Sequence, residues 1–514
     1  MQTVIGIDIG TQSTKAMVLD QEGQILAEHS QGYRVNTPRP LWAEQWPEIW
    51  WDAVLNCLNA CLNAPGINSR DVKGLCVSSL YGGSGIPVDN DIRPLHPCLI
   101  WMDRRADAQV QWVKEHIDLT QLGTITGNGV DSYYGFTKMM WLKAERPDIW
   151  KQTRYLLPPN SYINYLLSGE IAIDHSSAGN IGGIYDLEKR DWSTEMLEAL
   201  DIERNKLPDR LVDSATPVGG LLPSIADLTG LCEGIPVIAG GVDAAMATLA
   251  AGATRPGNHV AMIGTSMCWG VINRHVDASH GLISMPHVLN SDRDLYIFGG
   301  ALTAGASVSW YVDTFCGEDR AEAGESSSAF ERLEPAAHEL SPGANGLLFL
   351  PYLMGERSPV WDAQASAGFI GLSLYHQRHH LYRAVLEGVT FALRHNMEAV
   401  TRQGVALDDH LIVVGGATHS NLWMQIIADV IGMPVYTYQE NVEAALGAAL
   451  LAGQATGLLD LTRPLEHGTL IKRAEPCETA AKSYNELFSL YCQLYPTLKP
   501  IMHRLSALPT SSSE

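Results

Sequence analysis

A carboxylate followed by a glycine–threonine turn lies near the start of this 514-residue chain. Asp8 stands at the end of an apolar run and is followed by Gly10 and Thr11. A carboxylate in this place can hold magnesium beside a turn whose N–H groups donate to phosphate oxygens. Glycine lets the backbone approach such a ligand closely. Taken alone, the pattern is as often an ordinary β-hairpin, so it indicates a phosphate site only weakly.

The same turn occurs a second time, about half the chain later. Ile-Gly-Thr stands at residues 9–11 and again at 263–265, and apolar runs flank both copies, at residues 4–19 and 259–272. Apolar runs that meet at a glycine-containing polar turn are typical of β-hairpins. The repeat favours duplication over chance, and two facing hairpins could hold one polyphosphate from both sides. The common phosphate loop GxxxxGK[ST] does not occur, because no lysine follows a glycine.

A second carboxylate, Asp243, follows an apolar segment that runs through Gly240 and Gly241. At the carboxyl end of a strand, beside a crevice between domains, it could act on a substrate hydroxyl as a general base. The alternative is that Asp243 is the N-cap of a helix over residues 244–251. Considered without the rest of the chain, the N-cap is the better interpretation.

Residues 411–417 are a further candidate for binding. An apolar strand ends there in Gly415, Gly416 and Ala417, directly before a helix-like segment. A strand–glycine–helix junction favours a nucleotide near the start of the helix. A close-packed turn between strand and helix explains the same residues equally well.

Strand-like and helix-like segments alternate between these sites, which predicts an α/β fold. Residues 72–80 and 235–245 are typical of strands, and residues 46–62 and 384–400 of amphipathic helices. We expect a boundary near Gly240 that divides the chain into residues 1–242 and 243–500, followed by a partly disordered tail at 501–514. A segment rich in Glu, Ser and Ala, residues 317–343, predicts a loop with a short solvated helix.

Composition excludes several classes of function. Hydrophobic residues make up 46% of the chain and the net charge is −22, which predicts a large core and disfavours nucleic acid or an anionic membrane as a partner. The nine cysteines include no CxxC pair, the N-terminus lacks a signal-peptide pattern, and no apolar stretch approaches the ~20 residues of a membrane helix. We therefore expect a cytoplasmic protein with a small-molecule partner; a homodimer is compatible with the sequence.

Together the segments resemble the FGGY carbohydrate kinases of the actin-like ATPase superfamily, over residues 3 to 500. Residues 367–387, AGFIGLSLYHQRHHLYRAVLE, match the family's C-terminal signature in full. Residues 133–143, YYGFTKMMWLK, match the N-terminal signature in part, since Gly135 stands where the pattern has Pro, Ser or Thr. Residues 350–362 also look like a family segment. The resemblance implies two actin-like, ribonuclease-H-like ATPase domains with a cleft between them.

The resemblance also implies roles for single residues. It places magnesium at Asp8, and it makes Asp243 the catalytic base, which reverses the preference for an N-cap. ATP is the implied phosphate donor. The residues implied to bind it are Gly10, Thr11, Gln12, Thr14, Lys15, Gly264, Thr265, Ser266, Gly415, Gly416, Ala417 and Asn421.

The acceptor is less well marked. Several segments are similar to xylulokinases, but the Met-His-Gly group by which those enzymes touch the sugar is replaced at residues 80–83 by Leu-Tyr-Gly-Gly. Ala244 likewise stands where Asn usually follows the catalytic Asp. Residues 263–268 are similar to ribulokinases, and Tyr133 matches a substrate-touching tyrosine of glycerol kinases. We expect a five-carbon ketose such as xylulose, or a related ketose or polyol, bound by Tyr81, Gly82, Asp103, Arg105, Tyr133 and Asp243.

Two other functions remain compatible with this resemblance. A nucleotide-gated binding protein, such as a chaperone-like ATPase, would need an added peptide-binding domain, and the family match leaves little of the chain for one. A sugar sensor without catalysis would explain the altered residues 80–83, but Asp8 and Asp243 are both retained.

Overall fold

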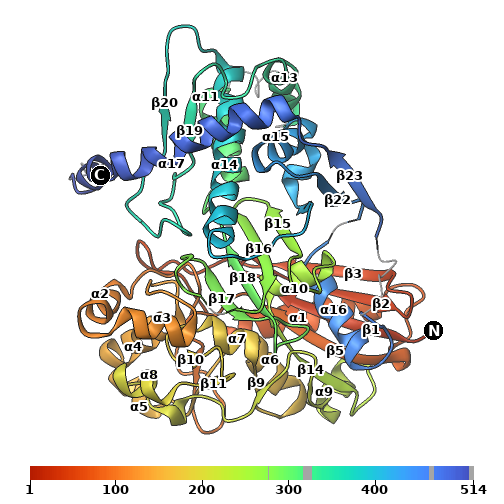
Figure 1. Ribbon diagram of the computed structural model, residues 1–514. Helices are drawn as coiled ribbons and strands as arrows, with labels where there is room; N and C mark the ends of the chain where they lie inside the picture. The colour runs from red at the N-terminus through yellow and green to blue at the C-terminus, as the bar shows by residue number, and fades with distance from the viewer. Residues whose placement is uncertain (276, 317–326, 441, 462–467, 509–514) are drawn as a thin grey trace.

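The computed structural model describes residues 1–275, 277–316, 327–440, 442–461 and 468–508. Figure 1 shows two lobes that meet around two β-sheets. The first sheet has six strands, in the order β13 (Pro217–Gly220), β14 (Pro236–Val242), β5 (Val72–Ser79), β1 (Thr3–Ile9), β2 (Ser13–Asp20) and β3 (Ile25–Gly32). The second has seven, in the order β17 (Ile283–Pro286), β18 (Leu295–Gly299), β16 (Met267–Asn273), β15 (His259–Ile263), β21 (Leu411–Val414), β22 (Val435–Tyr438) and β23 (Leu470–Ala474).

The two sheets repeat one topology. In the first, β1 and β2 form an antiparallel hairpin, β3 extends it, and β5 lies parallel to β1. In the second, β15 and β16 form the hairpin, β18 extends it, and β21 lies parallel to β15. The predicted duplication and the α/β class with two domains are confirmed. In this register Met262 of the second hairpin takes the place of Asp8 in the first, because each directly precedes Ile-Gly-Thr.

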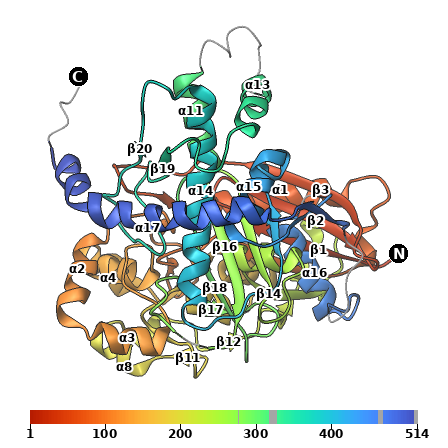
Figure 2. The same ribbon diagram turned by 45° about the horizontal axis from the view of Figure 1, so that its top comes forward.

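Helices surround each sheet. Between the strands of the first sheet the chain forms α1 (Pro47–Leu62), α2 (Asp107–His116), α3 (Leu119–Thr126), α4 (Gly135–Glu145), α5 (Pro147–Gln152), α6 (Pro159–Ser168), α7 (His175–Asn180), α8 (Thr194–Ala199) and α9 (Pro223–Thr229). The upper lobe in Figure 1 holds α11 (Gly305–Phe315), α13 (Ser327–His338), α14 (Arg378–Thr401), α15 (Asn421–Ile431) and α17 (Glu478–Ser506), and Figure 2 shows α17 lying across α14. The local sequence accounts for the amphipathic face of α1. This helix starts with Pro47 and buries Trp50, Val54, Cys57 and Cys61 along one side.

Two further helices, α10 (Asp243–Ala250) and α16 (Ala444–Ala455), connect the halves. Although α16 comes late in the sequence, it packs on β1 and β5 of the first sheet and against α10 (Figure 1). Small residues permit this contact: a Cβ atom at Gly6 would lie 2.1 Å from the carbonyl oxygen of Ala445. The approach brings the start of α16 close to the hairpin that carries Asp8.

Most of the predicted elements are present at the expected residues. Strands β5 and β14 and helices α1 and α14 confirm the four segments named from the sequence. In the tail that was predicted to be partly disordered, residues 501–514, the first residues are helical, because α17 continues to Ser506 and buries Met502. Residues 509–514 lie outside the described residues. The expected helix in the segment 317–343 is α13, whereas residues 317–326 also lie outside the described residues. Within the part of the chain that the structure describes, no helix has the length and apolarity needed to span a bilayer.

Candidate functional site

A cavity of about 280 Å³ opens where the two halves meet, at the ends of β1, β14 and the second hairpin. Both predicted carboxylates, Asp8 and Asp243, line it. Residues from both sheets complete the wall, and the lining set is Asp8, Thr11, Tyr81, Trp101, Tyr133, Val242, Asp243, Ala244, Ala247, Met262, Ser266, Cys268, Phe298, Arg357 and Ala444. We call it the acceptor cavity.

The environment of the two carboxyl groups favours their neutral forms. Burial, and next the charge of Asp243, raises the pKa of Asp8 to about 7. Burial raises the pKa of Asp243 to about 6, although the Ala244 N–H group and the Arg357 guanidinium oppose the rise. Two carboxyl groups with raised pKa values in one cleft are typical of a functional site. Both groups ionise easily only when a positive charge binds beside them.

Asp243 is placed by a strand–helix junction. Strand β14 ends at Val242, which is the N-cap of α10, and Asp243 is the first helical residue. Its Oδ1 accepts a hydrogen bond from the Ala244 N–H at 2.7 Å. The N-cap is therefore Val242 and not Asp243, although the Asp243 carboxyl group still satisfies one amide of the first helical turn while it lines the acceptor cavity.

Arg357, which no sequence pattern marks as a site residue, supplies a cation to the acceptor cavity. It is only 8% exposed, and its Nε has no hydrogen-bond partner within the described part of the chain. Its Nη2 lies 3.5 Å from the Met267 carbonyl oxygen, at the limit of a hydrogen bond. A buried guanidinium with an unsatisfied N–H is costly unless an anion binds there. Residues 350–362 resemble a family segment, but nothing in the local sequence marks Arg357 as a residue that lines the cavity.

A larger cavity of about 1080 Å³ lies within the second half. Four residues predicted to bind nucleotide line it: Gly264, Thr265, Gly416 and Ala417. The other lining residues were not predicted and include the aromatic rings of Trp310, Tyr382 and Trp423. Apolar and aromatic walls with a few polar groups are typical of a site for a small organic ligand. We call it the nucleotide cavity.

The second hairpin joins the two cavities. Gly264 and Thr265 line the nucleotide cavity, and the next residue, Ser266, lines the acceptor cavity. The Gly264 N–H donates to the Ser266 carbonyl oxygen at 3.0 Å, which closes the turn. A polyphosphate that follows this turn would pass from the larger cavity toward Asp8 and Asp243.

In the first hairpin, one predicted residue lines the acceptor cavity and another forms the turn itself. Thr11 lines the acceptor cavity, and its Oγ1 accepts a hydrogen bond from Trp101 Nε1 at 3.0 Å. The Gly10 N–H donates to the Ser13 carbonyl oxygen at 2.8 Å and so belongs to the turn itself. Thr11 is therefore the residue of this turn that the structure places at the cavity.

Five other residues predicted to bind ATP are placed away from the lining of both cavities. Thr14 is fully buried beside Tyr33, 3.2 Å between hydroxyl oxygens, and Gln12 is exposed. The Lys15 amine lies 2.5 Å from Glu443 Oε1, and Arg473 Nη2 donates to Asn421 Oδ1 at 2.6 Å. Gly415 has a φ of 95° and lies against the Ile263 carbonyl, which is the close-packed turn of the alternative interpretation. Contacts of these residues with ATP stay predictions.

The predicted acceptor residues separate into two groups. Tyr81 and Tyr133 line the acceptor cavity, with ring centroids 4.9 Å apart. Lys138 is fully buried and holds the Tyr133 segment, since its Nζ donates to the carbonyl oxygens of Ser132 and Tyr133 at 2.6 and 2.9 Å. The Tyr133 segment is thus held by a buried amine that the sequence marks only as part of a signature.

Asp103 and Arg105 are instead engaged with each other. Arg105 Nη2 lies 2.7 Å from Asp103 Oδ2 and 2.8 Å from Glu44 Oε2, and its guanidinium carbon lies 3.7 Å from the centroid of the Trp42 ring. Asp103 also accepts from the Ala43 N–H at 2.6 Å. Neither side chain lines the acceptor cavity. This ion pair fixes the loop that carries Trp101, and direct contact of the pair with a substrate stays a prediction.

The donor set suits a magnesium ion. Oδ1 of Asp8 is buried and has no hydrogen-bond partner among the described residues, as expected of a group that binds a cation. Magnesium usually takes one or two protein carboxylates and completes its shell with water and substrate phosphates. Asp8 with Asp243 close by provides such a set.

Comparison with known proteins agrees with this arrangement. Residues 3–250 match the N-terminal domain of the FGGY family of carbohydrate kinases, and residues 259–456 match its C-terminal domain. A xylulose kinase of Bacillus subtilis is 30% identical over 508 residues, 98% of either chain. Two structures from Lactobacillus acidophilus, a ligand-bound xylulose kinase and a gluconate kinase, each have a TM-score of 0.89 at 26% identity, covering 97% of this chain and 99% and 98% of theirs.

Proposed function

The chain belongs to the FGGY family of carbohydrate kinases, and we propose that it transfers the γ-phosphoryl group of ATP to a hydroxyl of a five-carbon ketose, with Asp243 as general base. The kinase class follows from the family, which covers both halves of the chain. The observation that supports the detailed assignment is the route along the second hairpin, from the nucleotide cavity to a cavity that contains two carboxyl groups with raised pKa values.

In this proposal the nucleoside occupies the nucleotide cavity, between Trp310 and Gly416, and the phosphates follow Gly264, Thr265 and Ser266. Phosphoryl transfer needs positioning and neutralisation of charge rather than covalent catalysis by the protein. The Arg357 guanidinium is placed to offset negative charge in the acceptor cavity. Its buried Nε, which has no partner among the described residues, supports this role, because a guanidinium with an unsatisfied N–H is stabilised when an anion binds beside it.

Asp243 accepts the proton of the attacking hydroxyl in this proposal. Its raised pKa brings the carboxylate closer to the range in which a general base is effective near neutral pH. Magnesium would be held by Asp8 and would neutralise phosphate charge. Asp8 would then be ionised, because a bound cation favours the carboxylate form.

Xylulose is the first acceptor to test, because relatives named xylulose kinase match over nearly the whole chain. The fold alone does not select it, since the gluconate kinase structure fits with the same TM-score as the xylulose kinase structure. Residues 80–83 and Ala244 also lack the side chains that the resemblance would lead one to expect in a xylulokinase.

An acceptor screen tests the proposal. ADP release would be measured with a coupled assay over pentuloses, hexuloses, pentitols, glycerol and gluconate, each with and without magnesium. We expect magnesium-dependent turnover with the highest kcat/KM for a five-carbon ketose. If no acceptor raises ADP release while ATP and a sugar both still bind, the chain is a sugar sensor without turnover and the kinase proposal is wrong.

A further inference from the structure

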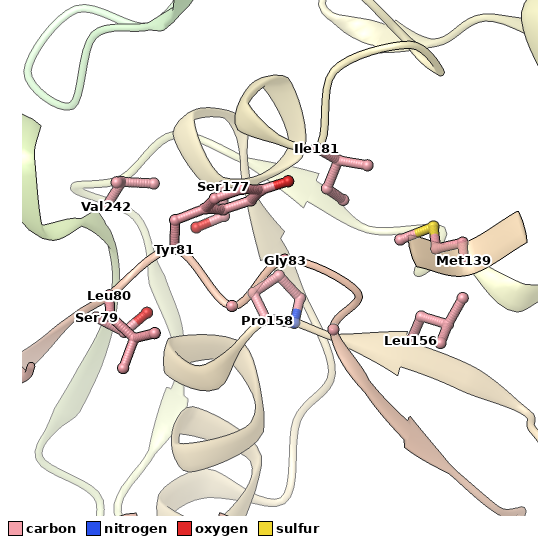
Figure 3. A pocket seen from close by; sticks show the side chains of 12 residues that line it. Ser79, Leu80, Tyr81, Gly83, Met139, Leu156, Pro158, Ser177, Ile181 and Val242 are labelled. Atoms are coloured by element: carbon pink, nitrogen blue, oxygen red, sulfur yellow. The ribbon is translucent and has the colours of Figure 1, made fainter. Parts of the chain in front are cut away.

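The side chain of Tyr81 lies between two cavities. It lines the acceptor cavity, and it also lines a small rear cavity of about 10 Å³, the size that holds at most one water molecule. The rear cavity is enclosed mainly by apolar residues, among them Leu80, Met139, Leu156 and Ile181. Figure 3 shows the Tyr81 ring standing between Val242 on one side and Ile181 and Met139 on the other.

The ring is held at its face and at its tip. Its face packs on Tyr133, with an angle of 38° between the ring planes. Its hydroxyl oxygen accepts a hydrogen bond from the Gly135 N–H group. Tyr81 is 6% exposed, so the ring is a fixed part of the wall.

Three glycines allow the close packing around Tyr81, because a Cβ atom at any of them would clash with a neighbouring atom. A Cβ atom at Gly135 would lie 2.1 Å from the Gly83 carbonyl oxygen and 2.8 Å from the Tyr81 hydroxyl. Gly83 has a φ of 50°, and a Cβ there would lie 2.1 Å from the Leu99 carbonyl oxygen. A Cβ at Gly82 would lie 2.4 Å from the ring of Pro159. Gly135 departs from the N-terminal signature and occurs together with the altered segment 80–83. A proline at position 135 would also lack the N–H group that donates a hydrogen bond to the Tyr81 hydroxyl.

We propose that Tyr81 determines acceptor specificity by closing the rear end of the acceptor cavity, so that chains of five carbons or fewer fit and longer ones meet the ring. This inference rests on the proposed kinase function. Because residues 82 and 83 present no side chain, the tyrosine ring is the only side chain of the segment 81–83 that reaches the cavity. Removing the ring joins the acceptor cavity to the rear cavity and provides room for a longer acceptor.

The test compares Tyr81→Ala and Tyr81→Leu with the unchanged protein on matched ketoses and polyols of five, six and seven carbons. We expect the ratio of kcat/KM for six-carbon over five-carbon acceptors to rise about 10-fold or more, since one added group in a closed pocket changes selectivity by ~10–200-fold. Tyr81→Phe keeps the ring and should keep the length preference. Tyr375→Ala, at a tyrosine that is 66% exposed and lines neither cavity, is the matched control and should change nothing.

A second readout does not depend on turnover. Each acceptor's shift in Tm on binding to each variant, with ADP present, reports the same length preference. If the unchanged protein phosphorylates no acceptor but the Tm shifts still move toward longer acceptors in Tyr81→Leu, the kinase proposal fails and the role of Tyr81 stands. An unchanged length preference in both truncated variants overturns the role of Tyr81, as does an equal change in Tyr81→Phe, which would assign the effect to the hydroxyl.

Discussion

Gly264 and Gly416 of the nucleotide cavity face open space, whereas Gly83 and Gly135 beside Tyr81 are packed against neighbouring atoms. For Gly264 and Gly416, an added Cβ atom would meet no other heavy atom of the described residues within 4 Å. For Gly83 and Gly135 it would meet a carbonyl oxygen at 2.1 Å. The first kind leaves room beside the backbone for a ligand, and the second kind lets two segments of backbone approach each other. The same residue type therefore has opposite roles in the two regions.

The two hairpins differ in a second respect. Asp8 precedes Ile-Gly-Thr in the first, and Met262 takes that place in the second, yet both side chains line the acceptor cavity. Duplication has supplied two similar turns, but only the first has a carboxylate. We infer that the second hairpin guides the phosphates and the first binds the cation.

We expect the largest effect when the carboxylate that distinguishes the first hairpin from the second is removed. Asp8→Asn keeps the size of the side chain and removes the charge that would hold magnesium. A metal ion stabilises the transition state by several kcal/mol, so kcat/KM should fall by about 10³-fold. The measurement is coupled ADP release over a range of magnesium concentrations. Met262→Leu, at the matching position, should change kcat/KM less than tenfold; equal losses in both variants would contradict the division of roles.

A pair of alanine substitutions tests the two kinds of glycine. Gly264→Ala should leave Tm unchanged and raise KM for ATP about 10-fold, because its methyl group occupies space beside the phosphates. Gly135→Ala should lower the free energy of unfolding by ~1–3 kcal/mol, as overpacking does, and lower Tm accordingly. Gly368→Ala also adds a methyl group in open space but lies outside both cavities, so neither quantity should change. A stable Gly135→Ala together with an unstable Gly264→Ala would reverse the comparison.

A smaller effect is expected from pH, on the acceptor side. Asp243 must be ionised to accept a proton, and burial raises its pKa to about 6. As pH falls through this value the carboxyl becomes protonated, so kcat/KM for the acceptor should fall with an apparent pKa near 6 rather than near ~3.9, the usual value for Asp. The neighbouring Asp8 is coupled to it, so the profile reports the pair. Constant kcat/KM down to about pH 5 would show that the group which titrates in catalysis does not have the raised pKa of Asp243.

Local patterns were sufficient for much of the fold and for part of the site. Alternating apolar runs with a glycine turn identify both hairpins, and Asp243 could be placed at a strand end because Gly240 and Gly241 precede it. The return of α16 to the first sheet could not be seen, because its alanine-rich sequence is buried almost all round and shows no single apolar face.

The features of the site that the sequence does not mark arise from tertiary contacts. Arg357 and Trp101 become cavity residues only when distant segments meet, and no spacing in the sequence marks them. Asp103 and Arg105 have the residue types expected of a sugar site, but Trp42 and Glu44, about sixty positions away, engage the arginine in a structural ion pair. In the same way the partner of Gly135 is Tyr81, 54 residues earlier.

The central claim is that Asp243 is the base that acts between the two halves, and Asp243→Asn tests it most directly. The variant would be measured for kcat with the best acceptor, for the Kd of ATP by calorimetry, and for Tm. We predict a kcat lower by ~10²–10⁴-fold, an unchanged Kd for ATP, and a Tm that is unchanged or raised, because a carboxylate that burial disfavours is removed. Near-normal kcat in a folded variant would contradict the account and leave Asp243 as a residue that only stabilises the first turn of α10.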